Sequence, residues 1–308
     1  RARGRQAMSA HAGPSRFAIR TRVLARALAD RTARRAPPAD PKRILVAHHL
    51  LLGDTLMLSA LVAKLRANHP DADLAMTVPR AAAPLYAMRP WGLRSLPWDP
   101  REPQYAPAQW PAGPAAEFGM PRNPFAVLHV GASTPLKRWS PDRWAAVATR
   151  LAIRGIEPVW SGGRGEEDVV RRCDPQARHR SYAGALDLAQ MRVLLDRARL
   201  LVSPDTGIAH LARVAATPSV TLYGPGSATI TGPGRFYAAV PWRGVAVDPF
   251  PCRAPHVLFR REIPWVTRCG RSPAECAHPR CMDAIDVEAV AGAIDDVLRR
   301  PDIRGATP

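Results

Sequence analysis

The sequence predicts an α/β fold with a doubly wound parallel sheet, because short apolar runs alternate with helical patterns through the second half of the chain. A connection that consists of a loop and one helix between two buried strands favours a parallel βαβ unit. Ligands of parallel sheets bind at the carboxyl ends of the strands. The apolar runs span residues 125–130, 157–160, 200–202 and 219–223, and the loops expected to line the crevice span 131–138, 161–166, 203–207 and 224–229.

The stretch from residue 200 to residue 226 shows the pattern most clearly. Its first apolar run predicts a strand, Gly207 opens a helical pattern, and the second run stops at a Gly-Pro-Gly turn. Asp205-Thr206-Gly207 therefore stands where free backbone N–H groups and the positive end of a helix dipole suit an anion, above all a phosphate. The alternative is that Asp205 only caps the helix and Gly207 only relieves a turn.

The remaining helices of this half follow from the same periodicity. They are expected at 141–153, directly after Glu166, at 187–197 and at 286–300. Pro141 suits the first turn of a helix. The loop at 161–166 contains glycines without the G-x-G-x-x-G spacing, so the sequence does not predict a dinucleotide fingerprint.

A smaller sheet is predicted in the first half, after a proline-rich linker that ends near Pro41. Asp54 follows the first strand at the start of a helix, where a carboxylate caps the helix or points into a cleft as a base. We divide the chain into a basic extension and linker (1–41), an abbreviated first domain (42–122) and a second domain (123–308). The first domain has strands expected at 43–47, 74–78 and 93–98 and helices expected at 54–68 and 81–88, before a proline-rich segment at 99–124.

The positive charge is concentrated at the start of the sequence. Of a net charge of +18, residues 1–43 hold twelve Lys and Arg against Asp30 and Asp40. A basic amphipathic pattern at 15–35 predicts a helix that lies on an anionic membrane surface. A solvated helix packed on the next domain and a mistranslated leader are the alternatives. No nucleic-acid recognition motif accompanies the arginines, so we expect no specific nucleic-acid partner.

The sequence contains no apolar run of about 18 residues and no hydrophobic core of a secretory signal. We therefore expect a cytoplasmic protein, peripheral on the inner membrane through its basic extension.

Five short motifs follow the predicted strands. They are Gly53-Asp54, Gly131-Ala132-Ser133 with Lys137-Arg138-Trp139, Ser161-Gly162-Gly163, Asp205-Thr206-Gly207 with His210, and Leu222-Tyr223-Gly224-Pro225. Their order and spacing resemble glycosyltransferase family 9, which includes the heptosyltransferases of lipopolysaccharide core assembly. The resemblance covers about residues 42–300 and is strongest in the second half.

The resemblance implies a GT-B architecture, in which two Rossmann-like domains face a cleft. It also implies an inverting, metal-independent glycosyltransferase that takes a nucleotide-diphosphate sugar, with ADP-heptose favoured, and a glycan or lipid-linked acceptor. Two alternatives stay open, a noncatalytic nucleotide-sugar-binding scaffold and a protein glycosyltransferase of the autotransporter type.

Roles for individual residues follow from the same resemblance. Asp54 would be the general base, Lys137 would meet the diphosphate, and Glu166 would contact the ribose. Displacement of a nucleoside diphosphate also requires such groups for chemical reasons. A base must lie on one face of the sugar, and a cation with helix N–H groups must stabilise the leaving diphosphate on the other. The alternative for His210 is a core histidine whose hydrogen bonds are satisfied by the backbone. The expected donor-binding residues are Gly53, Ser133, Thr134, Arg138, Gly162, Glu166, Asp205, Thr206, Gly207, His210 and Gly224.

The sequence departs from the family pattern in the first domain. His48-His49-Leu50 stands where many members carry a basic or small-residue loop, Val130 replaces a usual proline, and the acceptor domain is shorter. The short domain leaves open an unusual acceptor, a partner subunit that completes the site, or the scaffold.

Four cysteines cluster near the end of the chain, with His256 and His278 between them and Cys173 apart. A structural iron or zinc site is one interpretation, and some relatives bind iron through four cysteines in this region. The spacing matches no zinc ribbon, so buried thiols are the alternative. The clustered residues are Cys252, Cys269, Cys276 and Cys281.

Overall fold

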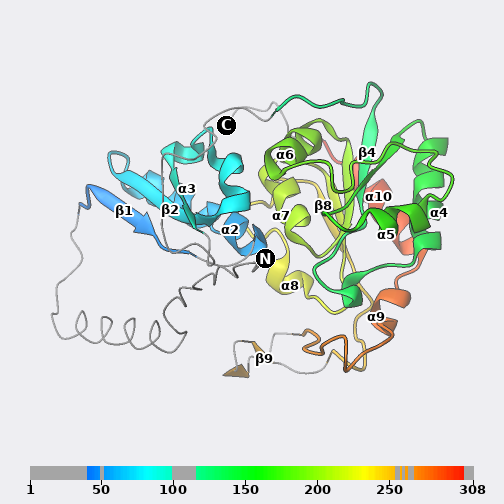
Figure 1. Ribbon diagram of the computed structural model, residues 1–308. Helices are drawn as coiled ribbons and strands as arrows, with labels where there is room; N and C mark the ends of the chain where they lie inside the picture. Colours follow the sequence, from blue (N-terminus) through cyan, green and yellow to red (C-terminus); the bar gives the residue numbers. More distant parts are fainter. Residues whose placement is uncertain are drawn as a thin grey trace, which may run out of the picture.

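The computed structural model describes residues 40–48, 52–98, 116–253, 257–258, 261–262 and 267–301 (Figure 1). The predicted helix at 15–35, the linker prolines Pro37 and Pro38, His256 and most of the proline-rich segment lie outside these ranges. The described residues form two parallel sheets, one for each predicted domain, so the expected α/β class is confirmed. Within the described ranges, no helix combines the length and the apolar character needed to cross a membrane.

The larger sheet has the strand order β5-β4-β6-β7-β8 and is parallel throughout. Four strands coincide with the predicted apolar runs, because a strand covered on both faces is apolar along its whole length. The chain order reverses between β4 and β6, which makes their carboxyl ends the switch point where ligands bind in such sheets. The strands are β4 (Phe125–His129), β5 (Glu157–Ser161), β6 (Leu200–Pro204), β7 (Ser219–Leu222) and β8 (Trp242–Val245).

Helices cover both faces of this sheet, and alternate residues of β4 show the division. Phe125 and Val127 join one core with α6 (Leu188–Arg197) and α7 (Gly207–Val214). Ala126 and Leu128 join a second core on the opposite face. That face is covered by α4 (Pro141–Ile153), α5 (Glu167–Cys173) and α10 (Val287–Leu298). The last helix, α10, packs on α4, β7 and β8 of its own domain.

The smaller sheet has the order β1-β2-β3, again parallel. The predicted helix at 54–68 is interrupted at Leu58, and the predicted helix at 81–88 is a 3₁₀ helix that contains Pro84. Proline has no N–H for an α-helical hydrogen bond, which accounts for the second difference. The elements are β1 (Arg43–Val46), α2 (Leu52–Met57), α3 (Ser59–Asn68), β2 (Asp73–Pro79), η1 (Arg80–Tyr86), η2 (Pro90–Gly92) and β3 (Arg94–Trp98).

The two domains share one apolar core. Buried side chains of the small sheet and its helices form a single cluster with those of α6 and α7. Helix α2 packs against α7, and η1 packs against α6. Two glycines permit the first contact, because a Cβ on Gly53 would lie 2.9 Å from His210 Cδ2 and one on Gly207 would lie 3.0 Å from Leu52 Cδ2.

Shorter elements complete the described chain. They are η4 (Pro135–Lys137), α8 (Ala228–Thr231), the antiparallel pair β9 (Val257–Leu258) and β10 (Arg261–Glu262), and α9 (Arg280–Asp283). Neither α8 nor β8 was predicted from the sequence.

Candidate functional site

A cavity of about 520 Å³ lies at the switch point of the larger sheet, between that sheet and helix α2. It brings together the ends of β4 and β6 with the residues that begin α2 and α7. Its lining residues are Leu52, Gly53, Asp54, Met57, His129, Gly131, Ala132, Ser133, Lys137, Gly163, Glu166, Asp205, Thr206, Gly207, Ile208, His210 and Thr231. Nine of the predicted site residues are therefore grouped around one space.

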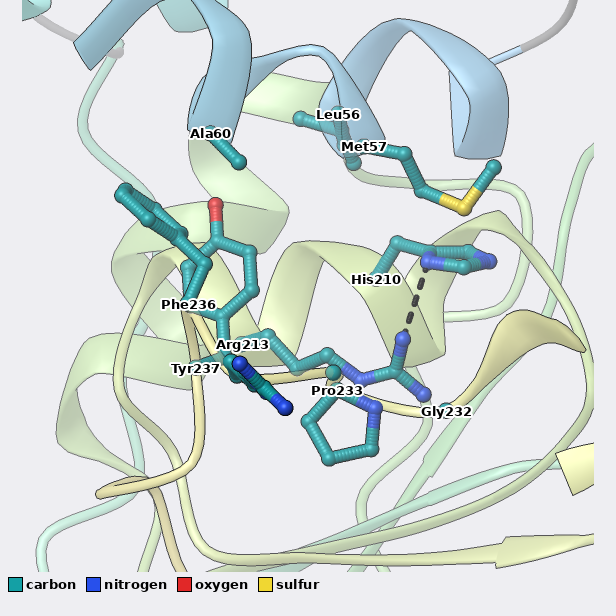
Figure 2. A pocket seen from close by; sticks show the side chains of 11 residues that line it. Leu56, Met57, Ala60, His210, Arg213, Gly232, Pro233, Phe236 and Tyr237 are labelled. Atoms are coloured by element: carbon teal, nitrogen blue, oxygen red, sulfur yellow. Dashed lines mark hydrogen bonds between the residues drawn. The ribbon is translucent and has the colours of Figure 1, made fainter. Parts of the chain in front are cut away.

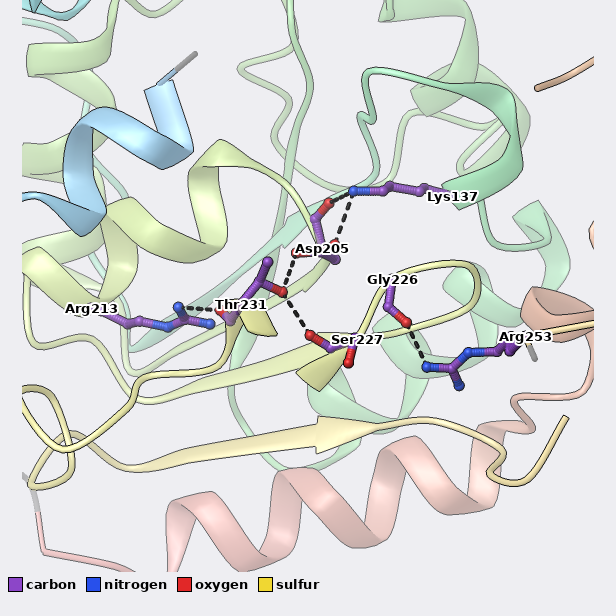
Figure 3. Close-up of polar contacts among 7 residues, drawn as sticks. All are labelled: Lys137, Asp205, Arg213, Gly226, Ser227, Thr231 and Arg253. Atoms are coloured by element: carbon purple, nitrogen blue, oxygen red, sulfur yellow. Dashed lines mark hydrogen bonds and ion pairs between the residues drawn. The ribbon is translucent and has the colours of Figure 1, made fainter. Parts of the chain in front are cut away.

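Lys137 and Asp205 form the polar centre of this cavity (Figure 3). Lys137 Nζ donates to the backbone oxygen of Asp205 at 2.7 Å and to its Oδ2 at 2.9 Å. Thr231 donates its hydroxyl to Oδ1 of the same carboxylate at 3.0 Å. The carboxylate also lies so close to Gly226 that a Cβ there would be 2.5 Å from Oδ2. Asp205 thus orders this loop with a lysine and a threonine, and the alternative that it caps α7 is wrong.

The N-terminus of α7 has no side-chain cap. Thr206 is the N-cap residue, but its side chain accepts no capping hydrogen bond, and its buried hydroxyl has no partner. Thr206, Gly207 and Ile208 all line the cavity. An uncapped helix start presents backbone N–H groups and the positive end of the helix dipole, so this edge of the cavity favours an anion.

His210 follows one turn later on α7 and faces the same cavity. Arg213 Nη1 lies 3.1 Å from His210 Nδ1. A guanidinium only donates, so Nδ1 accepts and the proton of the neutral ring is on Nε2. Burial and the nearby charge of Arg213 lower the pKa of His210 to about 4. His210 is thus a neutral donor at the cavity, and its side-chain partner is not the backbone group that the core-histidine alternative assumed.

Asp54 lies in the first turn of α2, half-buried, on the first-domain side of the cavity. Its neighbour Gly53 contacts the His210 ring. The segment before α2 is held by His48, whose backbone N–H donates to Thr77 Oγ1 at 2.5 Å and whose Nε2 lies 2.9 Å from Thr55 Oγ1. Asp54 therefore lines the same cavity as the α7 loop, at the junction of the two domains.

Glu166 joins two loops at the carboxyl ends of β4 and β5. Its Oε1 accepts from the Ala132 N–H at 3.0 Å and its Oε2 accepts from the Gly163 N–H at 2.7 Å. A Cβ on Gly131 would lie only 2.0 Å from Oε2, so a larger residue there would displace the Glu166 carboxylate. Both carboxylate oxygens are occupied by loop N–H groups, and a ribose contact through Glu166 stays a prediction.

Four predicted donor-binding residues do not line the cavity. Thr134 accepts from the Leu136 N–H, and Arg138 lies 3.8 Å from Glu166. Gly162 packs against Glu166 Cβ, and Gly224 faces Met282 of α9, where a Cβ would lie 2.4 Å from the thioether. These positions support the loops around the cavity.

Two polar lining residues, Thr231 and His129, escaped the sequence analysis because only the folded chain brings them to the site. Thr231 reaches Asp205 from α8, which has no periodic pattern in the sequence. His129 ends β4 inside an apolar run, where burial lowers its pKa to about 4. Its Nδ1 lies 3.0 Å from Ser161 Oγ.

The four clustered cysteines line a separate cavity of about 190 Å³. Burial raises the pKa of the Cys281 thiol, and the nearby thiols of Cys252 and Cys269 add to the effect. Among the residues that the structure describes, however, no three Cys, His, Asp or Glu side chains form a metal-ligand set. Cys173 is buried in α5 away from the cluster, and burial raises its pKa to about 12.

Comparison with known proteins points to one family. A family model described as glycosyltransferase family 9 (heptosyltransferase) matches residues 61–242. Lipopolysaccharide heptosyltransferase 1 of Pseudomonas aeruginosa is 31% identical over 114 residues, which are 36% of this chain and 32% of that protein. The chain thus spans about a third of the length of that curated relative. Asp54 precedes the range of the family model.

Solved structures show a similar fold. A family 9 glycosyl transferase from Veillonella parvula has a TM-score of 0.62 and 16% identity, covering 85% of this chain and 99% of that one. The E. coli ADP-heptose lipopolysaccharide heptosyltransferase II has a TM-score of 0.59 and 17% identity, covering 83% and 98% respectively. These likenesses confirm the expected GT-B fold.

Proposed function

We propose, from the premise that this chain belongs to glycosyltransferase family 9, that it transfers a sugar from a nucleoside diphosphate sugar to a hydroxyl of a glycan acceptor. The observation that carries the proposal is the cavity at the switch point. It groups the Asp54 carboxylate of one domain with Lys137 and the uncapped start of α7 from the other.

The proposed reaction is a direct displacement at the anomeric carbon. Asp54 takes the proton from the acceptor hydroxyl, whose oxygen forms the new bond to that carbon. The bond from the anomeric carbon to the diphosphate oxygen breaks, and the released negative charge is stabilised by Lys137 and the N–H groups of α7. The pKa of His210 is about 4, so its ring stays neutral above about pH 5 and donates a hydrogen bond through Nε2. Attack on the face opposite the leaving group inverts the anomeric configuration.

We propose ADP-heptose as the donor and a saccharide of the lipopolysaccharide core as the acceptor. The named relatives support this choice, since they are lipopolysaccharide heptosyltransferases and one is named for ADP-heptose. No step of the proposed reaction requires a metal ion.

The role of Asp54 is tested by Asp54→Asn. We expect transfer to fall by at least about 100-fold, the usual contribution of a general base, while ADP binding measured by calorimetry is retained. Asp71→Asn, at an exposed carboxylate of the same domain, is the matched control. Transfer that survives Asp54→Asn would contradict the mechanism, and retention of configuration in the product, measured by NMR, would contradict direct displacement.

The role of Lys137 is tested by comparing ADP with adenosine. A hydrogen bond to a charged group contributes about 1.5–3 kcal/mol, so Lys137→Met should weaken ADP binding roughly 10- to 100-fold and leave adenosine binding nearly unchanged. Lys64→Met, on the exposed side of α3, provides the control. Equal losses for ADP and adenosine would place the diphosphate elsewhere.

A noncatalytic nucleotide-sugar-binding scaffold is the second candidate, and the three-stranded first sheet favours it. It predicts tight ADP-heptose binding with no turnover on any saccharide or protein acceptor. The same calorimetry and transfer assays separate it from the enzyme, and any turnover that depends on Asp54 rejects it.

We propose two further properties, which concern the cysteine cavity and the basic extension. The cysteine cavity would hold structural iron or zinc only if its four thiols, which border one space, moved closer together than the structure places them, since thiolates are ligands for both metals. Elemental analysis of the purified chain and of Cys281→Ser tests this, and metal content below 0.1 per chain rejects it. The basic extension would place a cytoplasmic enzyme on the inner membrane, which sedimentation with anionic vesicles tests against a chain that lacks residues 1–39.

A further inference from the structure

The cavity at the switch point, here called the first cavity, is lined by a buried histidine that the proposed reaction does not use. His129 ends β4, is 6% exposed and borders this space. Because successive side chains of a strand point to opposite faces, His129 lies on the same face of the sheet as Val127, which belongs to the core shared with α6 and α7. The parallel register places Ser161 of β5 directly beside it. The ring therefore borders Ser161 as well as the space of the cavity.

The partner of Nδ1 determines which nitrogen of His129 carries the proton. Nδ1 lies 3.0 Å from Ser161 Oγ, and that hydroxyl donates to Met191 Sδ at 3.6 Å. A hydroxyl has one proton to donate, so both contacts are hydrogen bonds only when Ser161 accepts from Nδ1. Burial lowers the pKa of His129 to about 4, so the ring is neutral near pH 7. With the proton on Nδ1, Nε2 is an acceptor.

His210, the other histidine that lines the first cavity, has the opposite arrangement. Figure 2 shows its ring from the side of a second cavity, of about 270 Å³, with Nδ1 facing Arg213. Arg213 is 3% exposed, and its Nη1 also donates to the Thr231 backbone oxygen at 2.6 Å. A guanidinium only donates, so the proton of His210 is on Nε2. The first cavity is thus lined by one histidine that donates and one that accepts.

His129 stands at the part of the cavity that Glu166 borders. Glu166 joins the loops that follow β4 and β5, and its charge partly offsets the effect of burial on the pKa of His129. Lys137, to which we assign the diphosphate, is instead one of the charges that add to burial in lowering the pKa of His210. Phosphate oxygens are acceptors, so Nε2 of His129 cannot bond to them. The ring therefore faces a part of the bound nucleotide other than its diphosphate.

The Nε2 atom of His129 is open to the cavity. Within the described ranges it makes no hydrogen bond, and it is not one of the fully buried polar atoms that lack a partner. A nucleoside diphosphate sugar has hydroxyl groups on the ribose and on the transferred sugar, and each can donate to this lone pair. The two carboxylates that line the cavity from the second domain, Asp205 and Glu166, already accept from protein donors. An open, neutral acceptor at this place suits a hydroxyl.

We infer that His129 accepts a hydrogen bond through Nε2 from a sugar hydroxyl of the bound nucleotide sugar, and that Ser161 holds the ring in the tautomer that permits it. His129 is then a binding residue, and Ser161 is a positioning residue. The identity of the ligand rests on the proposed function, whereas the tautomer does not.

The tautomer is read by ¹⁵N NMR of the chain labelled at histidine, because protonated and unprotonated ring nitrogens have well-separated chemical shifts. Near neutral pH, the free chain should show the proton of His129 on Nδ1 and that of His210 on Nε2. The spectrum of His129→Phe assigns the signals. Ser161→Ala should move the His129 proton to Nε2 in part of the molecules, which a merely structural role of Ser161 would not do. A His129 proton on Nε2 in the unaltered chain would overturn the inference.

Calorimetry identifies the hydroxyl. The unaltered chain and His129→Phe are compared for binding of ADP, 2′-deoxy-ADP, 3′-deoxy-ADP, ADP-heptose and inosine diphosphate. Affinity ratios are used, because a loosened fold weakens all nucleotides alike. A ribose hydroxyl at Nε2 predicts that one deoxy nucleotide binds about 3- to 10-fold more weakly than ADP, and that this ratio falls to about one in His129→Phe. A hydroxyl of the transferred sugar predicts instead that His129→Phe lowers the ratio of ADP-heptose to ADP affinity by about 3- to 10-fold.

Two further variants complete the comparison. Ser161→Ala, which keeps the imidazole, should lower the same ratio in part, and it tests the inference even if His129→Phe does not fold. His278→Phe, at an exposed histidine, should leave every ratio unchanged.

The outcomes separate the inference from the proposed function. Ratios that are the same in the unaltered chain, His129→Phe and Ser161→Ala would overturn the inference. A change confined to the ratio of ADP to inosine diphosphate would place the amine of the base at Nε2 and would also overturn it. A chain that binds none of the nucleotides contradicts both. A ratio that depends on His129 in a chain that transfers no sugar would reject the proposed function and keep His129 as a binding residue.

Discussion

Two buried histidines at the first cavity should make the fold sensitive to mild acid. Burial lowers the pKa of both His129 and His210 from 6.5 to about 4. Between these values the unfolded chain takes up protons that the folded chain does not. The free energy of unfolding therefore falls as the pH decreases from about 6.5 to about 4, and these two groups cause no further loss at lower pH.

The size of the effect follows from the two pKa values. Between pH 8 and pH 5.5, each histidine should lower the free energy of unfolding by roughly 1.4 kcal/mol. The pair together should lower it by about 3 kcal/mol. This is a large part of the stability of an ordinary domain, which is about 5–15 kcal/mol. Most carboxylates remain ionised at pH 5.5, so this window reports mainly on histidine.

Urea unfolding at pH 8 and pH 5.5 measures the difference directly. His129→Gln should reduce the loss on acidification by about 1.4 kcal/mol, because glutamine has no proton to take up in this range. His278→Gln, at an exposed residue, controls for the loss of an imidazole. If His129→Gln and the unaltered chain lose the same stability between the two pH values, His129 is not held neutral by burial and this reasoning is refuted.

Two glycines that pack closely against side chains, Gly53 against His210 and Gly226 against Asp205, give further predictions. Gly53→Ala should destabilise the chain by about 1–3 kcal/mol in urea unfolding, because its Cβ would lie 2.9 Å from the His210 ring. Gly292→Ala in α10, where a Cβ meets nothing within 4 Å, should stabilise it by roughly 0.5–1 kcal/mol, and equal effects would show that α2 and α7 are not tightly packed. Gly226→Ala should displace Asp205 from Lys137 and weaken ADP binding in calorimetry by about tenfold, whereas Gly270→Ala, with open space around it, should not. Unchanged ADP affinity in Gly226→Ala would separate the Lys137–Asp205 pair from donor binding.

The elements that the sequence predicted well are those with a strong periodic signal. Buried parallel strands such as β4 and β6 are continuous apolar runs. Helix α4 has the predicted bounds, and Pro141 marks its start. Strand β8 was missed because it is an edge strand of the sequence Trp-Arg-Gly-Val, which is neither apolar throughout nor alternating.

The candidate site divides in the same way. Residues on loops after predicted strands, such as Lys137 and Asp205, could be placed near one another from the parallel topology alone. Thr231 and Arg213 could not, because their importance depends on which side chains and unpaired groups the tertiary fold brings to them. An arginine within an amphipathic helix is usually exposed, and nothing in the sequence indicates that Arg213 is 3% exposed.

The shared core also gives a physical account of the short first domain. Three parallel strands with helices have little apolar surface to bury alone, and here Leu56, Met76 and Leu93 belong to the same cluster as Leu194 and Leu211 of the second domain. The small sheet is thus stabilised by α6 and α7 and does not need a complete core of its own. The same contact places Asp54 beside the α7 loop, since Gly53 meets His210 and Gly207 meets Leu52. Shortening the domain is therefore compatible with keeping a base at the donor cavity, and the packing of α2 on α7 is the feature on which both stability and the proposed chemistry depend.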